Sequence, residues 1–244
     1  MTVDAARANG WLLRPVSGDP VARLFCLPYL GAGASMYHRW PRRIGEVEVC
    51  LLQPPGRENR LLEPAHQAYE PFAEDLLAAV EPLLDRPYAL FAHCNSVFAA
   101  YVVALRLAAA GHRPRRFFAS SMVAPDQVPF GSLLDVPADR LPEVVADLMR
   151  ARGTEPSPEI VELAMEAVES DLRAYRDFGG AAPAPMPCPV TVLSWRDDRT
   201  VPPSLTTGWT RFGQDRAVSL DGDHWAFLDP SPALLRIIAE DLAG

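Results

Sequence analysis

The sequence predicts an α/β fold, with a mostly parallel central sheet flanked by helices. Segments 21–27, 47–53 and 88–93 have the length and apolar composition of buried strands, and segments with helical periodicity separate them. Strands that are apolar throughout, alternating with helices, are typical of a parallel sheet that is covered on both faces. The 244 residues suffice for a single domain with a full core.

The elements follow in order along the chain. We predict strands at 21–27, 47–53, 88–93, 115–121, 189–195 and 217–220. We predict helices at 36–44, 69–84, 97–109, 141–152, 158–166, 168–178 and 232–242. Segment 124–184 is rich in proline and acidic residues and contains no good strand, so we interpret it as a helical lid inserted into the domain of residues 1–244. The run 179–185 is its expected hinge.

Composition excludes several function classes. The formal net charge of -8 argues against a nucleic-acid partner. We see no signal peptide and no apolar stretch long enough to span a bilayer, so we expect a cytoplasmic protein and no membrane association. The four cysteines show no C-x-x-C spacing, so we expect reduced thiols and no metal site.

The junction of strand 88–93 with helix 97–109 is the strongest functional signal. It leaves no room for a loop, so the chain must turn a sharp corner at Cys94, between the small residues Ala92 and Ser96. This arrangement is similar to the nucleophile elbow G-x-S-x-G, with Cys94 in place of serine. The positive end of the helix dipole favours a nucleophilic thiolate there. The alternative is a buried structural thiol.

A glycine-rich turn follows the first strand, in residues 28–35. It matches no phosphate-binding pattern, but it stands where α/β-hydrolases supply a backbone amide to the oxyanion hole. We therefore expect the amides of Leu30 and Asn95 to bind an oxyanion; a flexible turn without chemistry is the alternative. We interpret the later charged turn at 57–60 as a solvated cluster of ion pairs.

A nucleophile at residue 94 needs a base and a group that orients the base. His224 lies in a polar turn just after a short strand, and Asp197 and Asp198 follow strand 189–195. The order nucleophile, acid, base is that of the α/β-hydrolase fold. His93 adjoins Cys94, but we expect it to point to the other side of its strand.

With these motifs in place, the sequence resembles the type II thioesterases that accompany polyketide synthases and nonribosomal peptide synthetases, over nearly its whole length. The matching segments are LPYLGAG at 27–33 with F-P-H-A-G-G, QPPGRENR at 53–60 with Q-L-P-G-R-E-x-R, AHCNS at 92–96 with G-H-S-M-G, SDLRAY at 170–175 with the lid helix, DRTV at 198–201 with D-P-x-V, and GDHWAF at 222–227 with G-x-H-F-F. The fifth match favours Asp198 over Asp197. The departures are Tyr29 for histidine, Cys94 for serine, and Asn95-Ser96 for Met-Gly.

The resemblance implies a Cys94–His224–Asp198 triad. Through an acyl-Cys intermediate it would cleave an acyl or aminoacyl thioester from the phosphopantetheine arm of an acyl or peptidyl carrier protein. The protein itself would need no cofactor, and its pathway would be one of antibiotic biosynthesis. Because a thioester on Cys94 keeps the acyl group activated, an acyltransferase (or a condensing or cyclising enzyme) is one alternative. An inactive module that binds carrier proteins is another.

Overall fold

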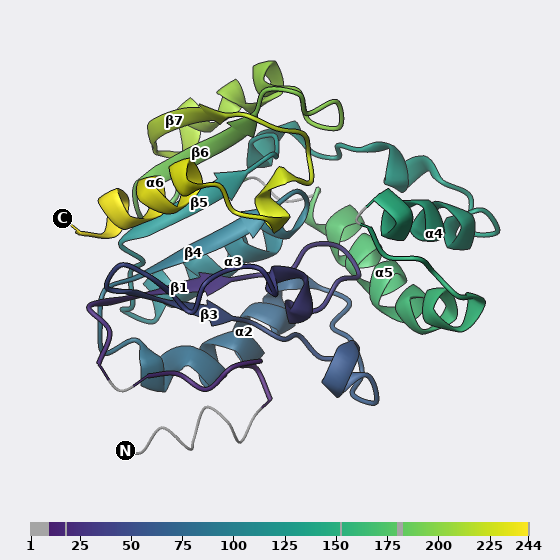
Figure 1. Cartoon of the computed structure of the whole chain (residues 1–244), viewed down its shortest axis with the longest axis horizontal. Helices are drawn as coiled ribbons and strands as arrows, with labels where there is room; N and C mark the ends of the chain where they lie inside the picture. Colours follow the sequence, from purple (N-terminus) through teal and green to yellow (C-terminus); the bar gives the residue numbers. More distant parts are fainter. Residues whose placement is uncertain (1–9, 18, 152, 180–182, 244) are drawn as a thin grey trace.

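The computed structural model describes residues 10–17, 19–151, 153–179 and 183–243. Within this part of the chain, seven strands form one sheet in the order β2-β3-β1-β4-β5-β6-β7 (Figure 1). The strands are β1 (Ala22–Cys26), β2 (Arg43–Ile44), β3 (Val47–Leu51), β4 (Tyr88–His93), β5 (Arg116–Ser120), β6 (Val190–Trp195) and β7 (Gln214–Leu220). All neighbours pair in parallel except β2 and β3. The predicted mostly parallel sheet is therefore confirmed.

Helices cover both faces of this sheet. They are α2 (Tyr69–Val80) and α3 (Ser96–Ala109) on one face and α6 (Pro232–Ala243) on the other, while α4 (Leu141–Ala151) and α5 (Pro158–Phe178) are not part of these layers. Successive strand side chains point to opposite faces. Leu90 packs in the hydrophobic cluster formed with α2 and α3, whereas Phe91 packs in the cluster that contains α6. This explains why the strands are apolar throughout.

Local structure departs from the predictions in four places. Segment 36–44 is not a helix: a 3₁₀ turn at Ala34–Tyr37 is followed by β2, since Pro41 interrupts the pattern and the chain pairs with β3. The two helices predicted at 158–166 and 168–178 are one helix, α5. A 3₁₀ helix at Pro203–Phe212 was not predicted, and β7 begins earlier than expected. Residue 152 and residues 180–182 of the expected hinge lie outside the described residues.

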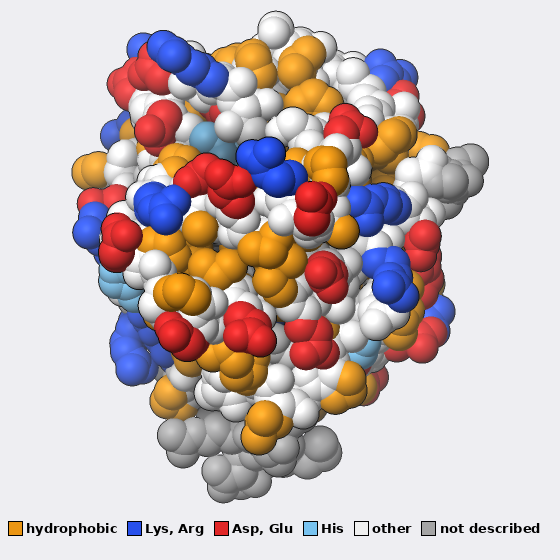
Figure 2. Space-filling view, turned by 90° about the vertical axis from the view of Figure 1, so that its right-hand side faces the viewer, with side chains coloured by type: hydrophobic (Ala, Val, Ile, Leu, Met, Phe, Trp, Pro, Cys, Tyr) orange, Lys and Arg blue, Asp and Glu red, His pale blue; other side chains and the backbone are white. Residues whose placement is uncertain are grey.

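Helices α4 and α5 lie between β5 and β6 in sequence and stand beyond the carboxyl ends of the strands (Figure 1). Figure 2 shows this side of the molecule, where hydrophobic side chains lie among acidic ones. Ile160 and Leu163 of α5 are 45% and 53% exposed.

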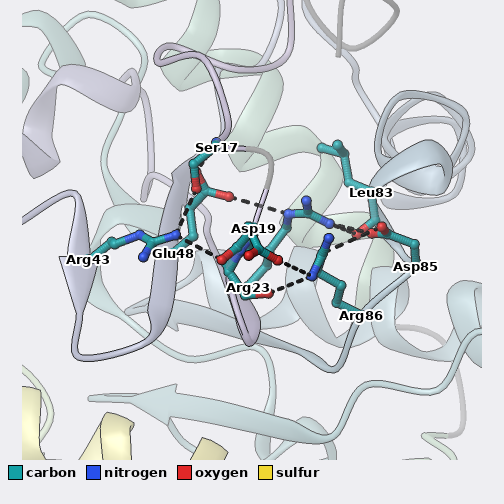
Figure 3. Close-up of polar contacts among 9 residues, drawn as sticks. Ser17, Asp19, Arg23, Arg43, Glu48, Leu83, Asp85 and Arg86 are labelled. Carbon is teal, nitrogen blue, oxygen red and sulfur yellow. Dashed lines mark hydrogen bonds and ion pairs between the residues drawn. The ribbon is translucent and has the colours of Figure 1, made fainter. Parts of the chain in front are cut away.

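A polar network around the buried pair of Arg23 and Glu48 holds the opposite, amino ends of β1, β3 and β4. Figure 3 shows Arg23 of β1 between Glu48 of β3 and Asp85, with nitrogen–oxygen distances of 3.4 and 2.5 Å. Arg23 also donates to the carbonyl of Leu83, and the amide of Ser17 donates to Glu48. The network joins the ends of three strands far from the carboxyl edge, so we assign it a structural role.

The charged turn at 57–60 is not the solvated cluster that the sequence suggested. Arg57 and Arg60 are buried, and backbone carbonyls and carboxylates accept hydrogen bonds from both guanidinium groups, although Nε of Arg57 has no partner among the described residues. Arg57 forms two hydrogen bonds of 3.0 and 3.1 Å with Asp171 of α5 and one to the carbonyl of Ala32. Arg60 pairs with Glu63 and lies over the ring of Trp11.

The pair of Arg57 with Asp171 joins α5 to the body of the protein. Asp171 also accepts a hydrogen bond of 2.7 Å from the amide of Gly31, in the loop that follows β1. A Cβ added at Gly31 would lie 2.3 Å from a methyl group of Val168, so this loop and α5 pack as closely as a glycine allows. One carboxylate thus fixes the helix, the loop and the buried guanidinium together.

We expect Asp171→Asn to destabilise the protein by about 2 kcal/mol, because the guanidinium of Arg57 stays buried without its counter-charge while Asp171 itself is partly exposed. Urea unfolding measures this. Asp177→Asn, at an exposed position of the same helix, is the matched control and should change stability by less than about 0.5 kcal/mol. Equal stabilities of the two variants would contradict the interpretation.

Candidate active site

The chain turns sharply between β4 and α3, with Cys94 at the corner. Cys94 has φ = +55°, a left-handed conformation that is costly for a residue with a side chain. Ser96 closes the corner: its hydroxyl donates to the carbonyl of His93 at 2.9 Å and accepts from the amide of His93 at 3.3 Å. Cys94 is only partly buried, whereas Cys26, Cys50 and Cys188 are buried. The strained corner therefore presents one thiol at the carboxyl edge of the sheet.

The structure brings together the three residues of the predicted triad. His224 Nδ1 lies 2.8 Å from Asp198 Oδ2, and the thiol of Cys94 is close enough to the same imidazole to affect its pKa. Because Nδ1 is hydrogen-bonded to Asp198, Nε2 is the ring nitrogen available to the thiol. Asp198 is buried, whereas Asp197 is exposed, in agreement with the preference for Asp198.

Four hydrogen bonds fix the carboxylate of Asp198. Besides His224, the hydroxyl of Ser121 donates to Oδ2 at 2.7 Å. The amides of Thr200 and Val201 donate to Oδ1 at 2.8 and 2.9 Å. Burial by itself would raise the pKa of Asp198, but these bonds, that of His224 first, hold it below its ordinary value. Asp198 thus stays ionised and orients the imidazole.

The groups around His224 determine its protonation state. Burial opposes the charged ring, but hydrogen bonds and charges from Asp198 and Cys94 outweigh burial and raise the pKa of His224 to about 10. The ring therefore carries a proton at neutral pH. A protonated imidazole beside a thiol is the arrangement of Cys–His catalytic pairs, in which the thiolate attacks and the imidazolium protonates the leaving group.

His93 points to the face of the sheet that carries Phe227, and its ring nevertheless lies beside this pair. Its ring stacks on Phe227 at 3.8 Å and meets the ring of His224 at 4.6 Å, measured between ring centroids. Burial, and next the charge of His224, hold the pKa of His93 well below its ordinary value. Nδ1 of His93 lies 2.9 Å from the hydroxyl of Ser120, which also accepts a hydrogen bond from the indole N–H of Trp195. His93 is therefore a neutral support for the His224 ring.

The structure also brings together the two predicted oxyanion residues, but in an unexpected way. The amide of Leu30 donates to the side-chain oxygen Oδ1 of Asn95 at 3.3 Å. The next amide in the loop, that of Gly31, donates to Asp171. Sequence reasoning missed both contacts, because they join residues 65 and 140 positions apart.

A groove and a small cavity lie next to these residues. The groove, of about 720 Å³, runs between the loop after β1 and helices α4 and α5, with Met36, Met149, Leu163 and Trp225 among its apolar lining. Trp225 is the neighbour of His224 in sequence. The cavity, of about 30 Å³, touches Leu30, Asn95 and Asp171.

Nowhere in the described ranges do three or more His, Cys, Asp or Glu side chains gather in a way that could hold a metal ion. Nor is any helix of the described chain sufficiently long and apolar to pass through a membrane.

Comparison with known proteins gives a consistent result. A family model described as a thioesterase domain matches residues 22–242. Thioesterase PikA5 of Streptomyces venezuelae is 31% identical over 82% of this chain and 73% of its own length. Phenyloxazoline synthase MbtB of Mycobacterium tuberculosis is 27% identical over 95% of this chain, which spans only 17% of that longer protein.

Solved structures agree with the family model. The type II thioesterase BorB from the borrelidin biosynthetic cluster superposes with a TM-score of 0.77 at 28% identity, over 95% of this chain and 97% of BorB. The predicted α/β-hydrolase fold is thus confirmed.

The imidazole of His224 offers a direct test of the site's electrostatics. We expect its ring to stay protonated up to about pH 10 and to be neutral above. In Asp198→Asn the opposing effect of burial remains while the carboxylate's charge is lost, so the ring should lose its proton at a clearly lower pH. Ring ¹⁵N chemical shifts followed against pH measure both midpoints. Asp197→Asn should leave the midpoint unchanged; an unchanged midpoint in Asp198→Asn would refute the assignment.

Proposed function

The chain belongs to the thioesterase family, and on that basis we propose that it cleaves an acyl or aminoacyl thioester from the phosphopantetheine arm of a carrier protein in polyketide or nonribosomal peptide biosynthesis. The observation that carries the proposal is Cys94, at a strained corner and close enough to His224 to affect its pKa, with Asp198 orienting the imidazole. PikA5 and BorB, which are similar to this chain, are both thioesterases, and this supports the reaction class.

The proposed first step is attack of the Cys94 thiolate on the thioester carbonyl. The bond between the carbonyl carbon and the pantetheine sulfur breaks, and His224 gives its proton to the departing thiolate, which leaves as the free thiol. The product is an acyl-Cys94 thioester and a neutral imidazole. Amides at the positions of Leu30 and Asn95 would stabilise the tetrahedral oxyanion, each such donor being worth about 3 kcal/mol of barrier.

In the second step water attacks the acyl-Cys94 carbonyl while His224 accepts a proton from it. The bond to Cys94 sulfur breaks, the free acid leaves, and the thiolate and imidazolium are restored. No cofactor of the enzyme's own takes part in this sequence, since the substrate arrives on the arm of its carrier.

Cys94 in place of serine supports a second candidate, acyl transfer. Moving an acyl group from one thiol to another is nearly thermoneutral, so the acyl-enzyme keeps the energy needed to acylate a second thiol, an amine or a hydroxyl. A third candidate, an inactive module that binds carrier proteins, would leave the residues around Cys94 without a chemical role.

Residues 124–184 are proposed to act as a lid that limits the access of water. Their contact with the loop after β1, through Asp171 and Gly31, supports this assignment. We also propose that the protein works in the cytoplasm, where free cysteines such as its four stay reduced.

The test uses an acyl carrier protein loaded with a panel of acyl groups. We expect intact mass to show one acyl group on the wild-type enzyme and none on Cys94→Ala, and we expect free acid to form without any added acceptor. His224→Ala should slow acid release by about a hundredfold to ten-thousandfold, as removal of a general acid–base does.

Other results would redirect the proposal. Turnover that requires an added thiol or amine, with negligible free acid, would assign the transferase instead. Absence of any adduct and of any turnover, with carrier binding retained, would leave only the binding module.

A further inference from the structure

The loop after β1 has two successive amides that are occupied by side chains from distant elements. The amide of Leu30 donates to Asn95, at the start of α3, and the amide of Gly31 donates to Asp171 of α5. Adjacent N–H groups of this kind make a site for a negatively charged oxygen. In the free protein both donors already have an internal acceptor.

The two acceptors differ in how firmly they are held. Asp171 is charged, lies 2.7 Å from the Gly31 nitrogen and forms two hydrogen bonds with the buried Arg57. Asn95 is neutral, and its oxygen lies 3.3 Å from the Leu30 nitrogen, slightly longer than the usual N–H···O distance. Asn95 is therefore the acceptor that an incoming ligand can displace.

The atom at the Leu30 amide must be the side-chain oxygen, since a backbone N–H can only donate. Leu30 and Asn95 are both buried, so without Asn95 this amide would lack a partner in the free protein. A cavity of about 30 Å³ borders the Asn95 side chain, enough for one or two water-sized groups. The amide group thus has space into which it can turn.

Resting on the proposed function, we propose that the Asn95 side chain is an internal, displaceable ligand of the oxyanion site. It occupies the Leu30 amide in the free enzyme and turns away when a tetrahedral oxyanion forms on Cys94. A charged oxygen is a much stronger acceptor than an amide oxygen. The oxyanion therefore displaces Asn95 readily, whereas the neutral carbonyl of a bound thioester competes poorly.

In this arrangement, residue 95 determines how strongly the Leu30 amide distinguishes a charged oxyanion from a neutral carbonyl. Where the resembling family has methionine, whose sulfur is a weak acceptor, the Leu30 amide would stay free. Here the amide is withheld from ground-state carbonyls and released to the transition state, which is differential binding of the kind that favours catalysis.

The test measures reversible addition of an acyl aldehyde to Cys94. The Cys94 thiolate adds to the aldehyde carbon, the π bond of the carbonyl breaks, and the negative charge passes to the aldehyde oxygen, which lies in the oxyanion site while His224 keeps its proton. Asn95→Met removes the internal ligand, so we expect the aldehyde to bind about twofold to tenfold more tightly, as loss of one competing hydrogen bond implies. Asn95→Asp puts a charged acceptor at the same place and should weaken binding at least tenfold. Asn59→Met, at an exposed position, should match the wild type.

A loss of aldehyde affinity in Asn95→Met as well as in Asn95→Asp would show that Asn95 merely supports the loop, and would overturn the proposal. Asn95→Ala serves if methionine does not fit. If the aldehyde fails to add to wild-type Cys94, the proposed function fails while the following measurement still tests the internal ligand.

That second measurement is the backbone amide resonance of Leu30 in the free protein, observed by ¹H–¹⁵N NMR. We expect it to shift upfield in proton frequency in Asn95→Met, because the hydrogen bond is lost, while the resonance of Gly31 changes little. A Leu30 resonance identical in both proteins would overturn the internal ligand whatever the enzyme's activity.

Discussion

The hydrogen bond between Asp198 and His224 is the contact on which the candidate site depends. It joins the turn after β6 to the turn after β7, and through the other ring nitrogen it reaches the thiol at the end of β4. The parallel order of β4, β5, β6 and β7 makes this possible, because the carboxyl ends of parallel strands meet at one edge of the sheet. Without the buried carboxylate, the pKa of His224 would lose one of the two contributions that outweigh burial, that of Asp198, and would be lower.

The sequence was sufficient to locate the candidate site residues whose positions follow from chain order and local geometry. Cys94 could be found because a strand and a helix meet there without a loop, and His224 and Asp198 because each follows a strand. Packing between distant segments could not be found in this way. Charged residues in a turn are usually exposed, yet Arg57 and Arg60 are buried, since they donate hydrogen bonds to carbonyls and carboxylates of distant segments. The contact of Asn95 with Leu30 depends on how α3 and the loop after β1 settle against each other.

Two departures from the family pattern act on the same reaction in our account. Cys94 keeps the acyl group activated after transfer, and Asn95 controls which oxygen reaches the Leu30 amide. The two amides of the loop after β1 thus contact two different elements. Leu30 contacts Asn95, at the start of α3, and Gly31 contacts Asp171 of α5, in the helical insertion. The helical insertion and the loop after β1 are therefore linked by direct contacts, and a change in one is expected to affect the other.

The central claim is that Cys94 carries the acyl group. Its most direct measurement is the position of an isotopically heavy acyl group after rapid quenching with an acyl-pantetheine, mapped by proteolysis and mass spectrometry. Our account predicts the label on the peptide that contains Cys94, attached at sulfur and labile to hydroxylamine. A label on Ser96, or on one of the buried cysteines, would contradict it.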